Sequence, residues 1–303
     1  MVSSLASVIP AADRVRWELE EVAAGVELLD VGRPFLPTGL VHADAAVVRP
    51  HARLGLALNQ LRAHGYLEVM GFLKRAVLPP LLGSAGPALF EDAEDFWAVL
   101  RVAEGEAKHL VLFDRFRAAV ETSFRAPLPR PEGTLERAVQ VLGEEPLAVA
   151  LLAAHVSFLA QEHYGRSQRD PGERDPCFGR LLKAHWQEQA VHGRVALRRL
   201  AVLRERSPAH AAQRGFEGYG RLLRWLDALL GERVERDLDV LATLGELDEG
   251  LRDRLRTDQR ASQRDVFLAA GLRHPQIKSL ISQHFSRFEA ALEALEASFA
   301  VRP

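Results

Sequence analysis

The sequence predicts an all-α fold built around a four-helix bundle. Apolar residues recur at the three- to four-residue spacing of a helix through most of the chain, and no alternating strand pattern stands out. Four long helical segments occupy its middle and are joined by shorter stretches that contain Pro and Gly. We therefore expect helices at 51–78, 91–124, 146–164 and 176–206, the number that a four-helix bundle needs.

The N-terminal part predicts one amphipathic helix over 11–29 and an irregular stretch over 30–50. Apolar side chains share one face of that helix: Val15, Leu19, Val22 and Val26. Helix breakers interrupt the second stretch: Gly32, Pro34, Pro37 and Pro50. We expect both segments to pack on the outside of the bundle.

Local signals set the ends of the bundle helices. Pro79-Pro80 should stop the first, because proline lacks the N–H that a helix interior needs. Pro146 and Asp175-Pro176 fit the first turns of the third and fourth, and Gly165 can cap the third. A short helix is expected over 134–142, in the connection between the second and third.

The C-terminal part predicts further helices that flank the bundle. They are expected at 207–230, 235–245, 248–257, 262–271 and 275–300. The charged run 232–239 resembles a solvated helix face. The chain would then have three parts: residues 1–50, the bundle at 51–206, and the C-terminal helices at 207–303.

Composition limits the classes of function. The 303-residue chain is 48% apolar, enough for a large core, and its net charge of −2 indicates no nucleic-acid partner. No apolar run is long enough to cross a bilayer and no signal peptide is evident, so we expect no membrane partner. The single Cys177 fits a reducing, cytoplasmic environment.

Two short stretches combine metal-ligand residue types at helical spacing. Glu106 and His109 are three residues apart and share a face. On the fourth helix His185, Gln189 and His192 form one stripe, with Glu188 at its edge. A Glu-x-x-His motif that faces the inside of a bundle is a common way for helical proteins to hold iron or manganese.

These stretches resemble a known family. The segments Leu58–Tyr66, Glu104–Phe113 and Leu181–His192 are similar to the ferritin-like p-aminobenzoate N-oxygenases, which are non-haem di-iron oxygenases. The resemblance runs over about 50–245 and implies a ferritin-like bundle. In that family four helices supply Glu, Glu-x-x-His, Glu and His-x-x-x-Glu-x-x-His, and two irons use dioxygen to oxidise a small molecule.

Aligned in this way, the chain keeps four metal ligands and lacks three. Glu106, His109, His185 and His192 match family ligands and are our predicted metal site. Three family glutamates fall on other residue types: Lys74, Ser157 and Gln189. The nearest carboxylates, Glu68 and Glu162, should lie on other helix faces, because they are six and five residues from the ligand positions.

The residues leave several interpretations of the site open. Glu188 can turn inward and complete a site for one metal with the histidines. Alternatively, Lys74 faces Glu106, so that its ammonium takes the place of a metal and the site holds none. We thus expect one or two iron ions, or none if the losses of Glu are real.

Three functions follow from these interpretations. The first is an oxygenase-type enzyme that uses iron and dioxygen on a small-molecule substrate. The second is a metal-free protein that binds a ligand or a partner protein. The third is a metal-independent enzyme that does acid–base work through His109, His185 or Glu106. We also expect a homodimer.

Overall fold

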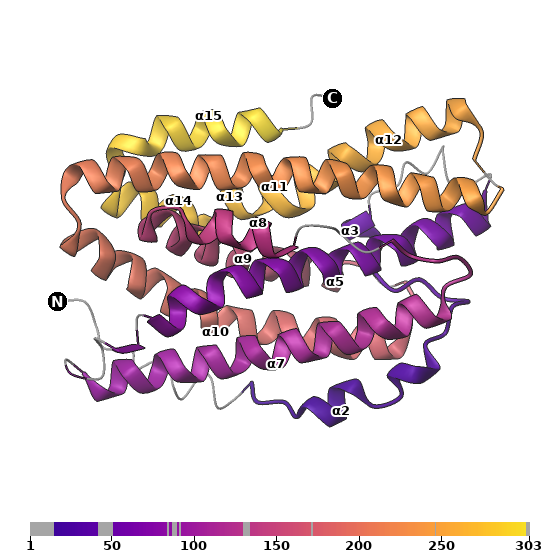
Figure 1. Ribbon diagram of the computed structural model, residues 1–303, viewed down its shortest axis with the longest axis horizontal. Coiled ribbons are helices and arrows are strands. Elements are labelled where there is room, and N and C mark those ends of the chain that lie inside the picture. The colour runs from indigo at the N-terminus through magenta and orange to yellow at the C-terminus, as the bar shows by residue number, and fades with distance from the viewer. Residues whose placement is uncertain are drawn as a thin grey trace.

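The structure, a computed structural model, describes residues 15–41, 51–83, 85–86, 90, 92–129, 134–170, 172–245 and 247–300. Every regular element within these ranges is a helix, so the predicted all-α class is confirmed. The four long helices of the middle are α5 (Ala52–Gly83), α7 (Ala93–Ser123), α9 (Pro146–Gln168) and α10 (Pro176–Arg206). They pack against one another as the predicted bundle (Figure 1).

The directions of these helices identify the type of bundle. Leu81, at the end of α5, packs with Val99 near the start of α7 and with Val195 in the second half of α10. Hence α5 is antiparallel to α7 and parallel to α10. Ala150, near the start of α9, lies with Leu81 at the same end of the bundle, so α9 is parallel to α7.

A parallel α7 and α9 need a connection that returns along the length of the bundle. The segment between them contains α8 (Thr134–Leu142), which lies against α5 (Figure 1). One long crossover between two antiparallel helix pairs is the connectivity of ferritin-like bundles.

Side-chain caps explain why these helices begin where the sequence predicts. The Asp92 side chain accepts hydrogen bonds from the backbone N–H groups of Glu94 and Asp95 at the start of α7. Asp175 accepts one from Phe178 at the start of α10, where Pro176 occupies the first turn. Such caps satisfy N–H groups that have no partner within the helix.

Two predicted helix ends are wrong. Helix α5 continues through Pro79-Pro80 to Gly83, because Leu81 is buried against α7 and the Pro80 carbonyl accepts a hydrogen bond from Nη2 of Arg199 at 3.2 Å. Helix α9 continues past Gly165 to Gln168, since Arg166 in its last turn forms an ion pair with Asp265 at 2.7 Å.

The N-terminal helix predicted at 11–29 is also wrong for the residues described. Only α2 (Leu19–Ala23) and a short 3-10 turn (Val26–Leu28) form there, because Gly25 adopts a φ of 75° between them. Residues 11–14 lie outside the described residues. The stretch predicted as irregular contains one short helix, α3 (Thr38–Val41).

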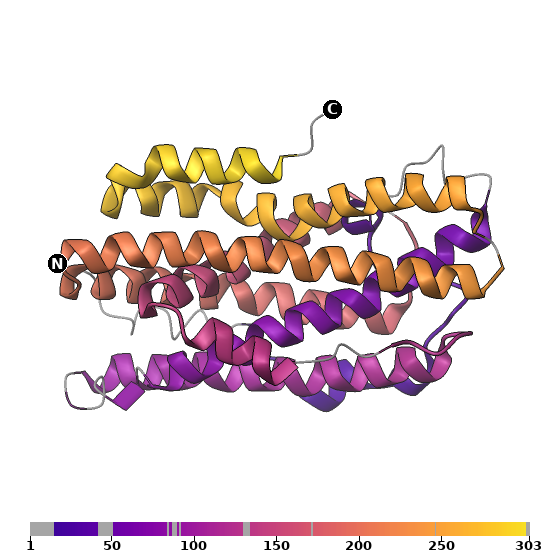
Figure 2. The ribbon, with the colours of Figure 1, turned by 45° about the horizontal axis from the view of Figure 1, so that its top comes forward.

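The C-terminal helices form a layer on the bundle, and the first of them is longer than predicted (Figure 2). One helix, α11 (Ala209–Thr243), replaces the predicted pair at 207–230 and 235–245. The segments predicted at 248–257 and 262–271 belong to α12 (Glu249–Arg264), a π-helical turn (Asp265–Ala269) and α13 (Ala270–Arg273), which follow one another without a gap.

The last predicted helix, 275–300, is instead two helices, α14 (Pro275–His284) and α15 (Glu289–Phe299). Phe285 leaves the helical conformation between them. The break places Phe288 in the core, where its ring stacks on Phe216 at 4.8 Å between centroids.

The charged run 232–239 is not a fully solvated face, contrary to our prediction. Arg233 and Asp237 are buried and form an ion pair at 2.7 Å. Arg233 also pairs with Glu68 of α5 at 2.6 Å, and so does Arg236. This buried network explains why α11 is continuous and why Glu68 is committed away from the centre of the bundle.

Two buried histidines of α9 attach the π-helical turn to the bundle. Nε2 of His155 donates to the Phe267 carbonyl and Nε2 of His163 to the Val266 carbonyl, both at 2.9 Å. A π-helical turn shifts the backbone hydrogen-bond pattern, and here side chains bond to its carbonyls. Burial lowers the pKa of His155 to about 4 and that of His163 to about 3, so both rings are neutral.

Candidate metal centre

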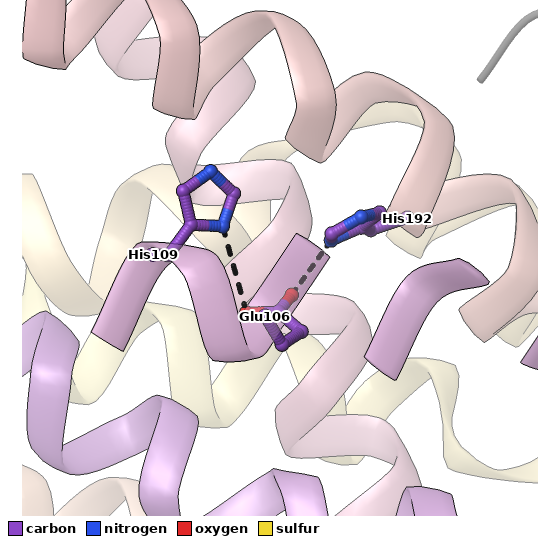
Figure 3. Close-up of side chains that lie close together, drawn as sticks. All are labelled: Glu106, His109 and His192. Carbon is purple, nitrogen blue, oxygen red and sulfur yellow. Dashed lines mark hydrogen bonds and ion pairs between the residues drawn. The ribbon is translucent and has the colours of Figure 1, made fainter. Parts of the chain in front are cut away.

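The predicted site residues meet at the centre of the bundle. Glu106 and His109 come from α7, and His185 and His192 from α10. All four are buried. Figure 3 shows the Glu106 carboxylate between the imidazoles of His109 and His192. Single ligand atoms of these three residues lie within 4.8 Å of one another, which is close enough for a shared metal ion.

Lys74 of α5 also points into this centre, as the alignment predicted. Its side chain is fully buried, and its ammonium forms an ion pair with Oε2 of Glu106. Burial alone would raise the pKa of the Glu106 carboxyl, but Lys74 and then His192 outweigh burial, so this pKa lies well below its usual value. Glu106 is therefore ionised at neutral pH.

The other two positions that lack Glu complete a hydrogen-bond chain. The Ser157 hydroxyl donates to Oε1 of Gln189 at 3.0 Å, and the Gln189 amide donates to Oε1 of Glu106 at the same distance. Lys74 and Gln189 thus contact the Glu106 carboxylate directly, and Ser157 is joined to it through Gln189. Two metal ions need bridging carboxylates, and this donor set does not supply them. The residues present do not fit a di-iron centre.

His192 and His109 both lie between two carboxylates. Nδ1 of His192 is 2.7 Å from Oε1 of Glu106, and its Nε2 is 4.0 Å from Oε1 of Glu188. Nδ1 of His109 is 3.9 Å from Oε2 of Glu106, and its Nε2 is 3.2 Å from Oε2 of Glu188. Glu188, predicted at the edge of its helix stripe, therefore faces the site.

His185 is the deepest of the three imidazoles. Its ring is 4.9 Å from that of His109 and 5.1 Å from that of Phe113, between centroids. Among the described residues, neither ring nitrogen has a hydrogen-bond partner, and the same is true of His109. Burial and then Lys74 lower the pKa of His185 well below its usual value, and burial followed by Lys74 lowers that of His109 to about 4.

Unpartnered buried nitrogens are unusual, because each costs about 1–3 kcal/mol when it loses water without gaining a partner. Their presence on two adjacent imidazoles is what a site for a metal ion or for ordered water requires. One ion near these histidines fits the donors, although two do not.

Two residues of the site had no strong signal in the sequence. Trp17, from the N-terminal segment, donates from Nε1 to Oε2 of Glu188 at 2.8 Å and stacks on His109 at 5.4 Å between centroids. This contact is 171 residues apart in sequence, so no local pattern announces it. The backbone of Gly105 lies against the Glu188 carboxylate, so close that a Cβ there would be 2.6 Å from Oε1. In the sequence nothing but its position between Glu104 and Glu106 pointed to it.

The two carboxylates weighed as substitutes lie elsewhere, as expected. Glu68 pairs with Arg233 and Arg236 on the α11 side of α5. Glu162 lies near His274, on the side of α9 that faces α14. Whether Glu106, His109, His185 and His192 bind metal as a set stays a prediction.

A cavity of about 40 Å³ adjoins the site between the four bundle helices. Lys74, Glu106, Ser157 and His192 form its polar end. Small and branched apolar side chains form its walls: Val77, Leu81, Val102, Ala150, Ala153, Val156, Val195 and Ala196. Arg199 lines it as well.

No single described helix is long and apolar enough to cross a membrane, although the bent pair Glu136–Leu142 and Pro146–Gln168 passes that test on length and composition.

Comparison with known proteins adds little to the geometry. No family model matches the chain, and no curated protein matches it. A similar solved structure is that of an R2-like ligand-binding oxidase mutant with aerobically reconstituted Mn/Fe cofactor. It is 15% identical, covers 88% of this chain and 94% of its own, and has a TM-score of 0.38. At that level it carries no conclusion about cofactor or reaction, and the connectivity of the four helices is what makes the fold ferritin-like.

Proposed function

We propose that the protein is an oxygenase-type enzyme that binds iron near His109 and His192 and oxidises a small molecule held in the adjoining cavity. The observation that carries this proposal is the buried group of Glu106, His109 and His192, whose ligand atoms lie within 4.8 Å of one another beside that cavity. Membership of the p-aminobenzoate N-oxygenases belongs to the same proposal.

The lining of the cavity suits a small substrate whose body is apolar. Its walls are aliphatic, and its polar end is the Lys74–Glu106 pair with Ser157 and His192. A pocket of this kind excludes bulk water, while a few polar groups orient the ligand. The substrate's reacting group would lie at the polar end.

Because Arg199 lines the cavity, we expect the substrate to carry a negatively charged group. Burial lowers the pKa of its guanidinium to about 10, and no described carboxylate forms an ion pair with it. Its partner is the Pro80 carbonyl. Arg199 is seven residues beyond His192, so their Cα atoms are about 10 Å apart along α10. An anionic group of the substrate would bind Arg199, at the end of the cavity away from His192.

The bound ion would supply redox chemistry with dioxygen. Transfer of one oxygen atom to the substrate releases the other as water and requires two electrons from an external reductant. The protein would hold Glu106 ionised through Lys74, orient His192 through Glu106, and keep water out with the apolar walls.

Iron content and oxygen uptake test this proposal. The wild-type chain is loaded anaerobically with Fe(II), desalted, analysed for iron, and then exposed to oxygen with ascorbate as reductant. We expect bound iron and iron-dependent oxygen consumption. A His109→Ala/His192→Ala variant should show neither. A wild type that retains no iron would reject the proposal.

The alternative function is a metal-free protein that binds a small molecule. The observation that favours it is the Lys74–Glu106 ion pair, since an ammonium already balances the charge of this carboxylate. In that case Fe(II) leaves the melting temperature of the wild type unchanged, whereas a small anion that enters the cavity raises it.

A further inference from the structure

We propose that His109, His192 and Glu188 bind one divalent transition-metal ion, and that Glu106 orients the imidazoles instead of binding the ion. The inference rests on the proposed function and makes it more specific, because it fixes the number of ions and the ligand atoms. It also gives a role to Glu188, which the family resemblance does not include among the ligands.

The hydrogen bonds of Glu106 determine the tautomer of His192. Glu106 is ion-paired with Lys74, and a carboxylate in an ion pair only accepts, so Nδ1 of His192 donates the 2.7 Å hydrogen bond to Oε1 of Glu106. The tautomer with its N–H on Nδ1 presents the lone pair of Nε2 toward Glu188, 4.0 Å away, and this is the form that binds a metal ion. A histidine ligand whose other nitrogen donates to a carboxylate is the usual arrangement at protein metal sites.

His109 has the same orientation. Its Nδ1 faces Glu106 and its Nε2 faces Glu188, yet neither nitrogen makes a hydrogen bond within the part of the chain that the structure describes. Nε2 lies only 3.2 Å from Oε2 of Glu188, so a lone pair here would face an anionic oxygen unless a cation lay between them.

The distances fit a common ion. Two ligand atoms about 2.1 Å from one ion are roughly 3.0–4.2 Å apart for angles between 90° and 180°. The two distances from Glu188, 3.2 Å to His109 Nε2 and 4.0 Å to His192 Nε2, fall in this range, one through each carboxylate oxygen. The rings of His109 and His192 are 6.0 Å apart between centroids, within the roughly 4.5–6.5 Å that the same geometry gives.

Gly105 keeps the space for this site open. A Cβ at position 105 would lie 2.6 Å from Oε1 of Glu188 and 2.9 Å from Nε2 of His192. Oε1 of Glu188 and Nε2 of His192, the two proposed ligand atoms, therefore both contact the α7 backbone at Gly105. A methyl group there would push both away.

The charges favour one ion over two. Lys74 balances the charge of Glu106, which leaves Glu188 as the anionic ligand beside two imidazoles. Two histidines and one carboxylate with open positions form the donor set of mononuclear Fe(II) oxygenases. His185, with both nitrogens unpartnered beside His109, can add a third imidazole.

The test measures Fe(II) binding by the metal-depleted full chain under anaerobic conditions. The wild type should bind close to one iron per chain. Glu188→Gln should weaken binding by at least about 100-fold, because losing a ligand exceeds the about 10- to 100-fold effect of losing an outer partner. Lys74→Met/Glu106→Gln, which removes the ion pair without leaving a buried charge, should weaken it by only about 10-fold.

Matched variants separate the site from the fold. Gly105→Ala should weaken binding by at least about 10-fold, whereas Gly179→Ala in α10, where a Cβ meets no atom within 4 Å, should not. Glu104→Gln, on the exposed face of α7, is the control for Glu188→Gln. Melting temperatures check that each variant is folded.

The failures are distinguishable. Iron bound by wild type and by Glu188→Gln alike, or two irons per chain, would overturn this inference and leave the proposed function in place. A wild type that binds no iron would overturn both.

Discussion

The Lys74 ammonium and the Glu106 carboxylate form an ion pair at the centre of the bundle, where both side chains are buried. Each charge offsets the free-energy cost of burying the other, because a buried charge is tolerated only beside a partner. The pair also fixes Glu106 in its ionised form, which orients His192.

Breaking this pair should destabilise the fold strongly. Lys74→Met leaves Glu106 as an unpaired buried charge, and we expect the free energy of unfolding to fall by about 3–5 kcal/mol in urea denaturation. Lys74→Met/Glu106→Gln should recover most of the loss. Lys278→Met is the control, since Lys278 pairs with Glu296 at 3.2 Å on the surface and should change stability by about 0–1 kcal/mol. Equal effects of the two Lys→Met changes would contradict a buried pair.

Stability should decline in mild acid because His155 and His163 are held neutral. Their pKa values in the fold, about 4 and about 3, lie below the ordinary 6.5, so the unfolded chain binds protons first as pH falls. The stabilisation is complete above pH 6.5 and is lost progressively down to the folded pKa, by up to about 1.4 kcal/mol per pH unit for each ring.

The variant His163→Gln tests this pH dependence. Urea denaturation from pH 7 to pH 5, with chelator present, should show a smaller loss of stability for His163→Gln than for wild type. The other buried histidines contribute equally to both proteins. Parallel pH profiles would mean that the pKa of His163 is the same in the fold as in the unfolded chain, and would contradict the prediction.

Gly271 should be required for the contact between α13 and α9. A Cβ there would lie 2.5–2.7 Å from three atoms of the His155 ring. Gly271→Ala should lower the free energy of unfolding by about 1–3 kcal/mol, the usual range for overpacking. Gly179→Ala, which has free space, should be neutral or stabilising by about 1 kcal/mol through helix propensity. Equal stability of the two variants would mean that His155 can move aside.

Arg199 should be retained for function at the expense of stability. Its side chain is half-buried and has no carboxylate partner among the described residues, so Arg199→Met should raise the free energy of unfolding by about 1 kcal/mol. Thermal melts check this. A clear destabilisation would instead assign Arg199 to packing and to its bond with the Pro80 carbonyl.

The sequence predicted the bundle well because its signals are local. Asp175 caps α10, and Pro176 and Pro146 occupy the first turns of α10 and α9, where a missing N–H costs nothing. Helix α10 begins and ends as predicted. Pro79-Pro80 failed as a stop because buried Leu81 holds the next turn in place. Tertiary burial outweighed the local rule.

For the candidate site, too, local signals placed some residues correctly, whereas contacts between distant segments were missed. Helical spacing placed Gln189 on the stripe of His185 and His192. In the structure Lys74 and Gln189 contact Glu106, and Ser157 reaches it only through Gln189. The contact of Trp17 with Glu188 depends on how the N-terminal segment packs, which spacing along α10 does not encode. Likewise, the pairing of Glu68 with Arg233 connects helices that are 165 residues apart in sequence.

The positions of Lys74, Ser157 and Gln189 around Glu106 predict that a second metal site can be built there. Lys74, Ser157 and Gln189 surround Glu106 at hydrogen-bond range or form part of its chain, so glutamates at these positions would face one another across the centre. Lys74→Glu/Ser157→Glu/Gln189→Glu removes the ammonium and adds three carboxylates, which bridging between two ions requires. Iron per chain should rise from about one to about two, and metal-free protein should become less stable, because the added carboxylates repel one another until ions bind. Elemental analysis and melting curves with and without Fe(II) measure both effects.

The control Lys278→Glu/Ser279→Glu/Gln283→Glu adds the same charge on exposed positions of α14 and should leave the iron content unchanged. A triple variant that binds no more iron than wild type would show that these positions do not share a common centre.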